Sequence, residues 1–327
     1  MTVTTNAVIG ESLAPPSWRR RFADHPNQLL LIVFVGLVII TGIKEPSYLS
    51  AAGLRNTLLL AAPLAILAGG QTLCLLTGGV DLSVSMTATA AAYVCANKSS
   101  LGATTAIMLG LGVAVVIGAV NGIGVAVGRV NPLIMTLGMQ GILVGLLTKG
   151  AQSFLKGSTN VTPFVKTLGG GAWGAVPYNV IVWIGVAVLL IWGLRSTGLG
   201  RSIYGVGDNP IACRLAGIKV WRVQFAVYVM CAVLAGIAGI LLAGRSGSVD
   251  LQLTNFLLLP SVAAAVVGGT SIFGGVGGYT GTILGALILG VLERLLLFMD
   301  ASEAIKQMLY GVLILGLAWL YAELTKS

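Results

Sequence analysis

Charged residues are scarce in this sequence of 327 residues. Only 9% of them are charged, whereas a soluble domain carries about a quarter. Hydrophobic residues make up 56% of the chain, and the mean hydropathy is +0.96. A soluble fold could not keep so much apolar surface away from water. The composition therefore excludes a soluble globular protein and predicts a chain that crosses a membrane several times.

Groups that bind metals or carry out catalysis are also scarce. The sequence has one histidine, His25, and four cysteines that form no CxxC pair. Metal sites and intramembrane enzymes need clusters of His, Cys, Asp or Glu. The G-x-x-x-x-G-K-[ST] motif that holds nucleotide phosphates is missing as well. We therefore expect no catalytic residue, no metal and no cofactor, and any ATP hydrolysis must reside on another polypeptide.

The net charge of +9 does not indicate a nucleic-acid partner. Apart from the triplet Arg19–Arg21, the 19 Lys and Arg residues are scattered singly along the chain and do not gather on one basic face. Single basic residues in short loops are what the positive-inside rule of membrane proteins requires. The partner that the charge pattern indicates is the lipid bilayer.

Long apolar runs are the main feature that is present. A spanning helix needs about 20 mostly apolar residues. Ten candidate segments lie near 27–43, 57–77, 82–97, 102–128, 131–149, 178–195, 222–243, 253–270, 279–299 and 303–323. The second, third and eighth are interrupted or flanked by glycine pairs, so the count lies between eight and ten. The expected fold is an all-α, polytopic membrane helical bundle.

Two basic clusters predict the orientation of the bundle. Arg19–Arg21 precedes the first segment, and the stretch from Arg195 to Arg222 follows the sixth. An even number of crossings separates the clusters, so both can face the cytoplasm. We therefore expect a cytoplasmic tail over 1–26, a transmembrane permease domain over 27–323 with a cytoplasmic loop over 196–221, and a cytoplasmic tail over 324–327.

Glycines four residues apart predict close contacts between helices. Such pairs place two small residues on one helix face, where a neighbouring backbone can approach. Four pairs occur, at Gly118 and Gly122, Gly124 and Gly128, Gly141 and Gly145, and Gly281 and Gly285. Glycine pairs at 69–70 and 78–79 are echoed at 268–269 and 274–275, as in transporters with internal repeats.

The cytoplasmic loop contains signals for a short helix. Gly207 to Pro210 reads Gly-Asp-Asn-Pro, a turn signal, and Asn209 and Pro210 suit the cap and the first position of a helix. A helix over Ile211 to Gly217 is expected, ending at the glycine. Two interpretations stay open: a projection that docks with a partner, or an ordinary connecting loop.

Asp81 is the one carboxylate expected within the bilayer, apart from those near helix ends. The preceding Gly78 and Gly79 predict a helix break, which places Asp81 near the start of the next helix. Unpaired amide groups there would stabilise its charge. A contact with the solute or a role in gating is the alternative, since charges within membranes are commonly functional.

Four segments resemble the ribose/xylose/arabinose-type permease family of ABC importers. Residues 205–218, GVGDNPIACRLAGI, resemble its conserved loop, usually close to GGNPEAARLAGI. Residues 78–84 resemble its GGIDLSVG motif, and residues 131–138 resemble its PFIVTLG segment. Residues 268–277 are nearly identical to its GGTSLFGGVG stretch. The matches occur in the family's order between about 55 and 320, although Asp208, Ile211, Cys213 and Ser85 depart from its usual residues.

The resemblance implies a passive translocation subunit of an ATP-driven importer in the bacterial inner membrane, for a small polar solute such as a monosaccharide. Its partners would be two ATP-binding cassette ATPase subunits, a periplasmic solute-binding protein, and a second copy or a sister permease. The alternative is a stand-alone secondary transporter driven by an ion gradient.

The resemblance also assigns two sets of site residues. The ATPase-coupling loop would contain Gly207, Asp208, Asn209, Pro210, Ala212, Arg214, Leu215, Gly217 and Ile218. The translocation path or helix break would contain Gly78, Gly79, Asp81, Ser83, Gly268, Gly269, Thr270, Ser271, Gly274 and Gly275.

Overall fold

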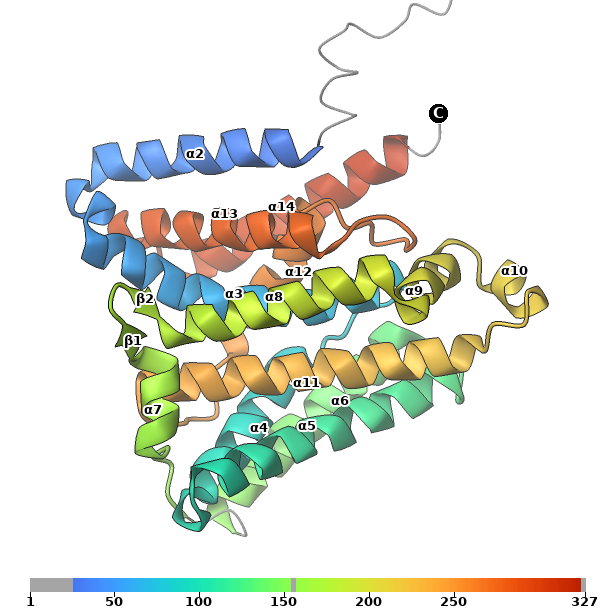
Figure 1. Ribbon diagram of the computed structural model, residues 1–327, viewed down its shortest axis with the longest axis horizontal. Helices are drawn as coiled ribbons and strands as arrows, with labels where there is room; N and C mark the ends of the chain where they lie inside the picture. The colour runs from blue at the N-terminus through green and yellow to red at the C-terminus, as the bar shows by residue number, and fades with distance from the viewer. Residues whose placement is uncertain (1–25, 154–156, 325–327) are drawn as a thin grey trace, which may run out of the picture.

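The computed structural model describes residues 26–153 and 157–324, which form an almost wholly helical bundle (Figure 1). Its elements, in chain order, are α2 (Pro26–Lys44), η1 (Pro46–Leu49), α3 (Ala51–Leu76), α4 (Val84–Asn97), η2 (Ser99–Leu101), α5 (Ala103–Ala126), α6 (Pro132–Gln152), α7 (Pro163–Gly170), β1 (Ala172–Trp173), β2 (Val176–Pro177), α8 (Tyr178–Ser196), α9 (Gly198–Asp208), α10 (Pro210–Leu215), α11 (Val220–Ser246), η3 (Asn255–Leu257), α12 (Leu258–Val267), α13 (Tyr279–Phe298) and α14 (Glu303–Leu324).

The ten expected spans are confirmed only in part. Within the described residues, six helices are long and apolar enough to cross a membrane: α3, α5, α6, α8, α11 and α13. Helices α4 and α12 have 14 and 10 residues, so they are only about 21 and 15 Å long at 1.5 Å per residue. That is less than the roughly 30 Å of a hydrocarbon core. The predicted segments 82–97 and 253–270 are therefore half-length helices next to a break.

Helices α3 and α11 form the centre of the bundle. The whole stretch of α3 from Ala61 to Leu76 is buried, as is most of α11. Helices α4, α5 and α7 pack against α11, while α8, α12 and α13 pack against α3. Because all sides of α3 are covered by protein, its apolar residues need no amphipathic pattern.

Two of the four glycine pairs face a neighbouring backbone, as predicted. A Cβ atom at Gly118 would lie 2.8 Å from the carbonyl oxygen of Tyr228, and one at Gly122 would lie 3.1 Å from Phe225 Cα, so α5 touches α11 there. Cβ atoms at Gly281 and Gly285 would overlap the backbone of α12. At Gly118, Gly281 and Gly285 a side chain would not fit without a shift of the neighbouring segment, and at Gly122 it would be tight.

The other two pairs do not form the expected helix contact through both glycines. A Cβ atom at Gly124 would meet the Met135 side chain of α6, but one at Gly128 would meet only its own helix. Gly141 and Gly145 of α6 have nothing within 4 Å of a built Cβ atom. The prediction for this last pair is therefore wrong within the chain, because α6 lies at the outside of the bundle.

The two ends of the bundle differ. Helices α9 and α10 lie at one end in Figure 1, and the first residues of α2 and the last of α14 lie toward that same end. The opposite end carries α7 and the β1–β2 hairpin, whose antiparallel strands pair Ala172 with Pro177 and Trp173 with Val176. The basic cluster Arg19–Arg21 and residues 325–327 lie outside the described residues, so the predicted cytoplasmic location of both tails stays a prediction.

Candidate functional site

Three of the four segments that resemble the permease family contain a glycine that ends a helix, and all three helices end in the same way. Helices α3, α10 and α12 are each followed by a glycine with positive φ, namely Gly78 (76°), Gly217 (81°) and Gly269 (84°). In each case the amide of the next residue donates to the carbonyl five residues earlier, at 2.9, 2.9 and 3.0 Å respectively. This is the Schellman arrangement, in which a glycine accepts the left-handed conformation without a steric cost. The predicted break at 78–79 and the predicted stop at Gly217 have this physical basis.

The first break, residues 77–83, folds back beside α3. The Gln71 side chain donates to the carbonyl oxygen of Asp81 at 2.6 Å and accepts from its amide at 3.3 Å. The amide of Leu82 donates to the hydroxyl of Thr136 on α6 at 3.0 Å. Side chains therefore satisfy backbone groups that a helix break would otherwise leave unpaired in the interior.

The Asp81 carboxylate holds the start of α4. Asp81 is 1% exposed, and its Oδ1 atom accepts hydrogen bonds from the amide and the hydroxyl of Ser83, at 2.8 and 2.6 Å. The Ser83 hydroxyl in turn accepts from Asn121 of α5 at 2.9 Å. Because the carboxylate fixes Ser83, the N-cap residue of α4, through both its amide and its hydroxyl, the geometry supports the structural interpretation of Asp81.

The second break, residues 268–278, contacts the first. The amide of Gly275 donates to the carbonyl oxygen of Leu76, the last residue of α3, at 3.0 Å. One turn deeper, the hydroxyls of Thr72 and Thr282 are 2.7 Å apart. Two motifs almost 200 residues apart in the sequence therefore pack together and form one seam, which we call the break seam: residues 76–83 and 268–278.

Helix α9 ends on the break seam, which corrects the expected turn at 207–210. Gly207 and Asp208 belong to the last turn of α9. A Cβ atom at Gly207 would overlap the carbonyl oxygen of Leu76 and lie 2.5 Å from the amide nitrogen of Gly275. The coupling-loop and break motifs of the sequence are thus in direct backbone contact.

Tyr204 adds a side-chain link between α9 and the break seam. Its hydroxyl donates to the carbonyl oxygen of Gly277 at 3.0 Å. Burial raises the pKa of Tyr204, and the nearby Arg195 charge offsets this only in part. The hydroxyl therefore remains a protonated donor at physiological pH.

Helix α10 projects away from the bundle (Figure 1). The Asn209 side chain accepts from the amides of Ile211 and Ala212 at 3.0 and 2.9 Å, which is the predicted cap. The helix ends at Leu215, two residues before the expected end, because Ala216 is its C-cap. Ile211 and Leu215 are 62% and 86% exposed, so apolar side chains form the tip of this projection.

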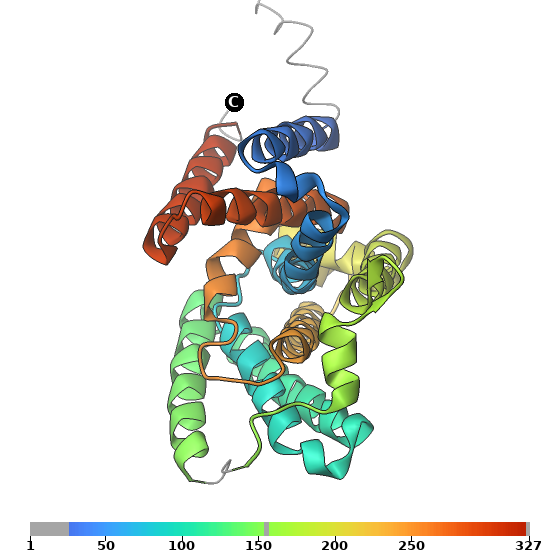
Figure 2. The same cartoon turned by 90° about the vertical axis from the view of Figure 1, so that its left-hand side faces the viewer.

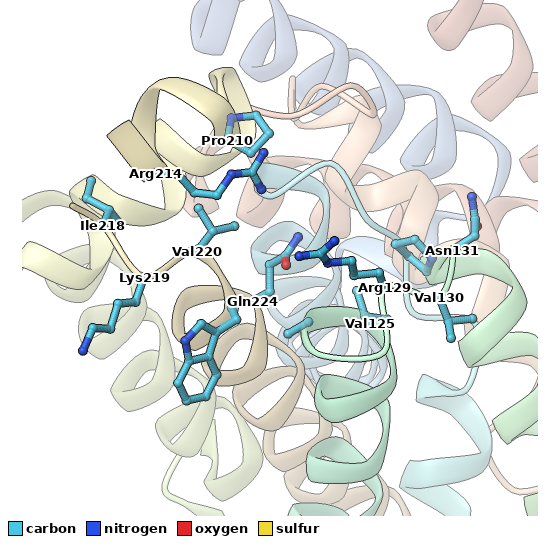
Figure 3. A pocket seen from close by; sticks show the side chains of 13 residues that line it. Val125, Arg129, Val130, Asn131, Pro210, Arg214, Ile218, Lys219, Val220 and Gln224 are labelled. Atoms are coloured by element: carbon cyan, nitrogen blue, oxygen red, sulfur yellow. The ribbon is translucent and has the colours of Figure 1, made fainter. Parts of the chain in front are cut away.

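A cavity of about 460 Å³ lies between the α10–α11 segment and the α5–α6 turn. Arg129 and Arg214 reach toward each other from opposite walls, with Gln224 between them, while Lys219 extends away (Figure 3). No acidic residue of the described chain lines this cavity. Two guanidinium groups facing one space repel each other and favour an anionic group between them.

The predicted path residues do not line an open channel in this structure. Asp81 and Ser83 are buried, as are Thr270 and Ser271. They lie in the break seam, which Gly207 and Asp208 of α9 contact, whereas α10 projects away from the bundle (Figure 1). The sequence analysis did not identify Arg129 or Tyr204 as site residues. The sequence offers one signal for Arg129: it lies in a turn, after Gly128 and before the Asn-Pro start of α6.

Comparisons with known proteins place these features in a family. Residues 53–318 match the family described as branched-chain amino acid transport system / permease component. The ribose import permease protein of Escherichia coli strain K12 is 35% identical over 96% of this chain and 97% of its own length. The fructose import permease protein of Rhizobium meliloti is 31% identical, covering 88% and 82%. The L-arabinose transport system permease protein of Escherichia coli strain K12 is 31% identical, covering 88% of each. No solved structure matches the chain significantly.

Proposed function

The chain belongs to the family of branched-chain amino acid transport system permease components, and from this premise we propose that it is the translocation subunit of an ATP-driven importer of a monosaccharide in a bacterial inner membrane. The observation that carries the cargo class is the similarity, over nearly the full chain, to import permeases named for ribose, fructose and arabinose. These names favour a sugar over the amino acids in the family's description.

ATP hydrolysis takes place on a separate ATPase subunit that docks at the α9–α10 end. The sequence has no phosphate-binding loop of its own. The exposed Ile211 and Leu215 side chains at the tip of α10 supply an apolar anchor for a groove on that subunit. Anchors of this kind, surrounded by polar and charged residues, dominate the energy of many protein interfaces.

Arg129 and Arg214 supply the charge complement. An acidic side chain of the ATPase enters the cavity between them and neutralises both guanidinium groups. This assignment extends the docking surface from the α10 helix to the α5–α6 turn, since Arg129 belongs to that turn. Removing one partner of a desolvated charge pair of this type costs on the order of 2–5 kcal/mol, much of it because the other charge is left unpaired.

The break seam transmits the docking movement to the membrane helices. Gly207 of α9 touches both the last carbonyl of α3 and the amide of Gly275. A shift of α9 therefore moves the ends of α3, α12 and α13 together, because backbone contacts leave no side chain that could absorb the displacement. The residues predicted for the path, from Gly78 to Ser83 and from Gly268 to Gly275, act here as a gate at the ATPase end.

A second permease, either another copy or a sister subunit, covers the exposed face of α6. Gly138, Gly141 and Gly145 leave that face open to a close backbone approach. The solute-binding protein docks at the opposite end, near α7 and the β1–β2 hairpin.

Reconstitution in vesicles tests the proposed function. The permease is combined with its ATPase and its solute-binding protein, and uptake of labelled ribose, fructose and arabinose is measured with and without ATP. We expect uptake of one of them that requires all three proteins and ATP. Uptake by the permease alone on a proton or sodium gradient would instead establish a secondary transporter.

Charge reversal tests the docking surface. Arg214→Glu and Arg129→Glu should each reduce co-purification of the ATPase and solute uptake, while the permease still inserts, because both residues lie at the helix ends. Arg222→Glu is the matched control, since Arg222 lies over the Trp221 ring, 5.3 Å from its centre, and does not line the cavity. Unchanged assembly in both cavity variants would remove the cavity from the interface.

A further inference from the structure

Amide side chains gather on the side of the molecule formed by α6, the segment 247–257 and α14. Figure 2 shows these three elements along one side of the bundle. Two cavities of about 220 and 610 Å³ open there, and both are lined by Gln252 and Asn255. The smaller one extends to Gln140 of α6 and the larger one to Gln307 of α14. We call this surface the amide groove.

The segment that carries Gln252 and Asn255 is fixed to the interior of the bundle. Near its start, the amide of Val249 donates to the carbonyl oxygen of Thr159 at 2.9 Å. Thr254, which is fully buried, bonds through its hydroxyl to the carbonyl oxygen of Ser85 and lies 2.6 Å from the hydroxyl of Thr89. One side of the segment is thus anchored on α4, and the other side presents Gln252 and Asn255 outward on a rigid support.

The position of Gln140 is unsuited to contact with lipid. Gln140 lies eight residues after Pro132 in α6, a helix long and apolar enough to span a membrane, and is therefore about 12 Å from the start of that helix. An amide without a hydrogen-bond partner costs roughly 1–3 kcal/mol in an apolar environment on protein scales. Polar side chains at membrane depth usually face a water-filled path or another protein surface.

The amides retain hydrogen-bonding capacity that the described chain does not use. Asn255 donates from Nδ2 to Gln252 Oε1 at 2.8 Å, and the backbone amide of Gln252 donates to Asp250 Oδ1 at 2.6 Å. These bonds do not use the Gln252 Nε2 donor or the Asn255 Oδ1 acceptor. The hydrogen bond between the two side chains holds this donor and this acceptor next to each other. Neighbouring donors and acceptors match the vicinal hydroxyls of a polyol, each of which both donates and accepts. Phe256 adds an apolar ring to the same wall, suited to the C–H face of a sugar.

We propose that the amide groove, with Gln140, Gln252 and Asn255 as its principal contacts, is the part of the translocation path that touches the polyhydroxylated solute. This inference rests on the proposed import function and goes beyond it by assigning the solute contacts. The predicted path residues of the break seam then form the gate, and the amide groove forms the lining.

Cysteine accessibility tests whether water reaches the groove. The native cysteines are all buried, so Gln252→Cys and Asn255→Cys introduce the reactive thiols. In vesicles that contain the complete transporter, an anionic methanethiosulfonate reagent should modify both at least about tenfold faster than Val116→Cys, because only the hydrated thiolate reacts readily. Val116 is the control: it is 63% exposed on α5, on a surface that we assign to lipid. The transported sugar, added with its binding protein and ATP, should slow the reaction at the groove positions.

Equal labelling at the groove and control positions would place the amides against lipid or protein and overturn the proposal. Labelling that the sugar does not slow would overturn the assignment of solute contact.

Uptake measurements separate the groove from the function on which it rests. The double variant Gln252→Ala/Asn255→Ala should lower the uptake per ATP hydrolysed by about tenfold, the effect of losing one to two hydrogen bonds. Assembly and ATP hydrolysis should be retained. Asn56→Ala is the control, because Asn56 is an exposed amide near the start of α3 and outside the groove. A wild-type complex that imports no monosaccharide would refute the proposed function, whereas normal uptake by the double variant would refute the groove alone.

Discussion

Helices α5 and α6 carry the same pattern of two glycines four residues apart, yet only one of the pairs is enclosed. Gly118 and Gly122 of α5 touch the backbone of α11, whereas Gly141 and Gly145 of α6 face open space. The difference lies in the position of the helices. Helix α5 packs broadly against α11 and α4, whereas α6 buries only a narrow stripe and exposes large apolar residues such as Ile134 and Leu137.

The comparison shows that one sequence pattern serves two different purposes. An enclosed glycine is required for the fold of the single chain, because any side chain would displace a neighbouring helix. An open glycine in a membrane helix leaves the fold unaffected and makes a close contact available to another chain. Substitutions at the two kinds of position should therefore affect different measurements.

The largest effect is expected when an enclosed glycine of α5 is filled. Gly118→Leu places a side chain against Ala232 and the carbonyl oxygen of Tyr228, contacts that are already below 3 Å for a Cβ atom. Overpacking of this kind costs about 3 kcal/mol or more at a backbone contact. The variant should not accumulate in the membrane, or should lose its thermal transition in detergent. Gly112→Leu on the same helix should behave as wild type, because nothing lies within 4 Å of its Cβ position. Comparable loss in both variants would contradict the distinction.

The next largest effect is expected in α9, which also has an enclosed and an open glycine. Gly207 is enclosed, whereas a Cβ atom at Gly198 would have only the end of the flexible Arg201 side chain nearby, at 3.9 Å. Gly207→Ala forces α9 away from Leu76 and Gly275, so it should separate ATP hydrolysis from transport. We expect sugar uptake to fall more than about tenfold while the membrane helices remain folded, since the clash lies at the end of the bundle and costs on the order of 1–3 kcal/mol. Gly198→Ala should retain uptake. Normal coupling in the Gly207 variant would show that the break seam is not part of the transmission.

A smaller effect is expected at the open glycines of α6. Gly141→Leu should leave the thermal stability of the isolated permease unchanged but weaken its association with a second permease by about tenfold or less, because a bulky side chain prevents the closest backbone approach. Light scattering or cross-linking in detergent measures that association. Gly185→Leu on α8, which is equally open, is the control. If the two variants dimerise alike, α6 is not the contact surface.

The smallest effect concerns Tyr204, which reinforces the enclosed contact of α9. Tyr204→Phe removes one hydrogen bond to Gly277, which is worth about 0.5–1.5 kcal/mol. Uptake should decrease a few-fold at most, and the variant should remain assembled.

The same residue predicts a direction of pH dependence. The pKa of Tyr204 is raised above its ordinary value of 10.0, chiefly by burial. The neutral hydroxyl is therefore favoured in the folded protein, and its stabilising contribution is complete below pH 10.0 and is lost only as the pH rises through the higher folded-state value. Thermal stability of the wild type and Tyr204→Phe should differ by a constant amount between pH 7 and pH 9. A difference that disappears in this range would contradict the assignment.

Several features of the site could be predicted from the sequence because they depend on neighbouring residues. The break at Gly78–Gly79, the cap by Asn209 and the stop at Gly217 are local hydrogen-bonding patterns. Glycine is the residue type typical of a helix end and asparagine of a helix N-cap, so the sequence predicts them. The ends of α9 could not be predicted in this way. Gly207 was expected in a turn, but contact with Leu76 and Gly275 keeps it in the last turn of a helix.

The sequence alone determined that this chain is a helical membrane protein of the permease family, because composition, apolar run length and four ordered motifs do not depend on how the helices pack. Only the tertiary structure decided which helices are complete and which are half-length, since α4 and α12 read as apolar runs in either case. It also brought residues 76–83, 207–208 and 268–278 into one seam and placed Gln140, Gln252 and Asn255 on one face. Contacts between such distant residues are set by helix packing, and a single sequence records the packing surfaces but not their partners.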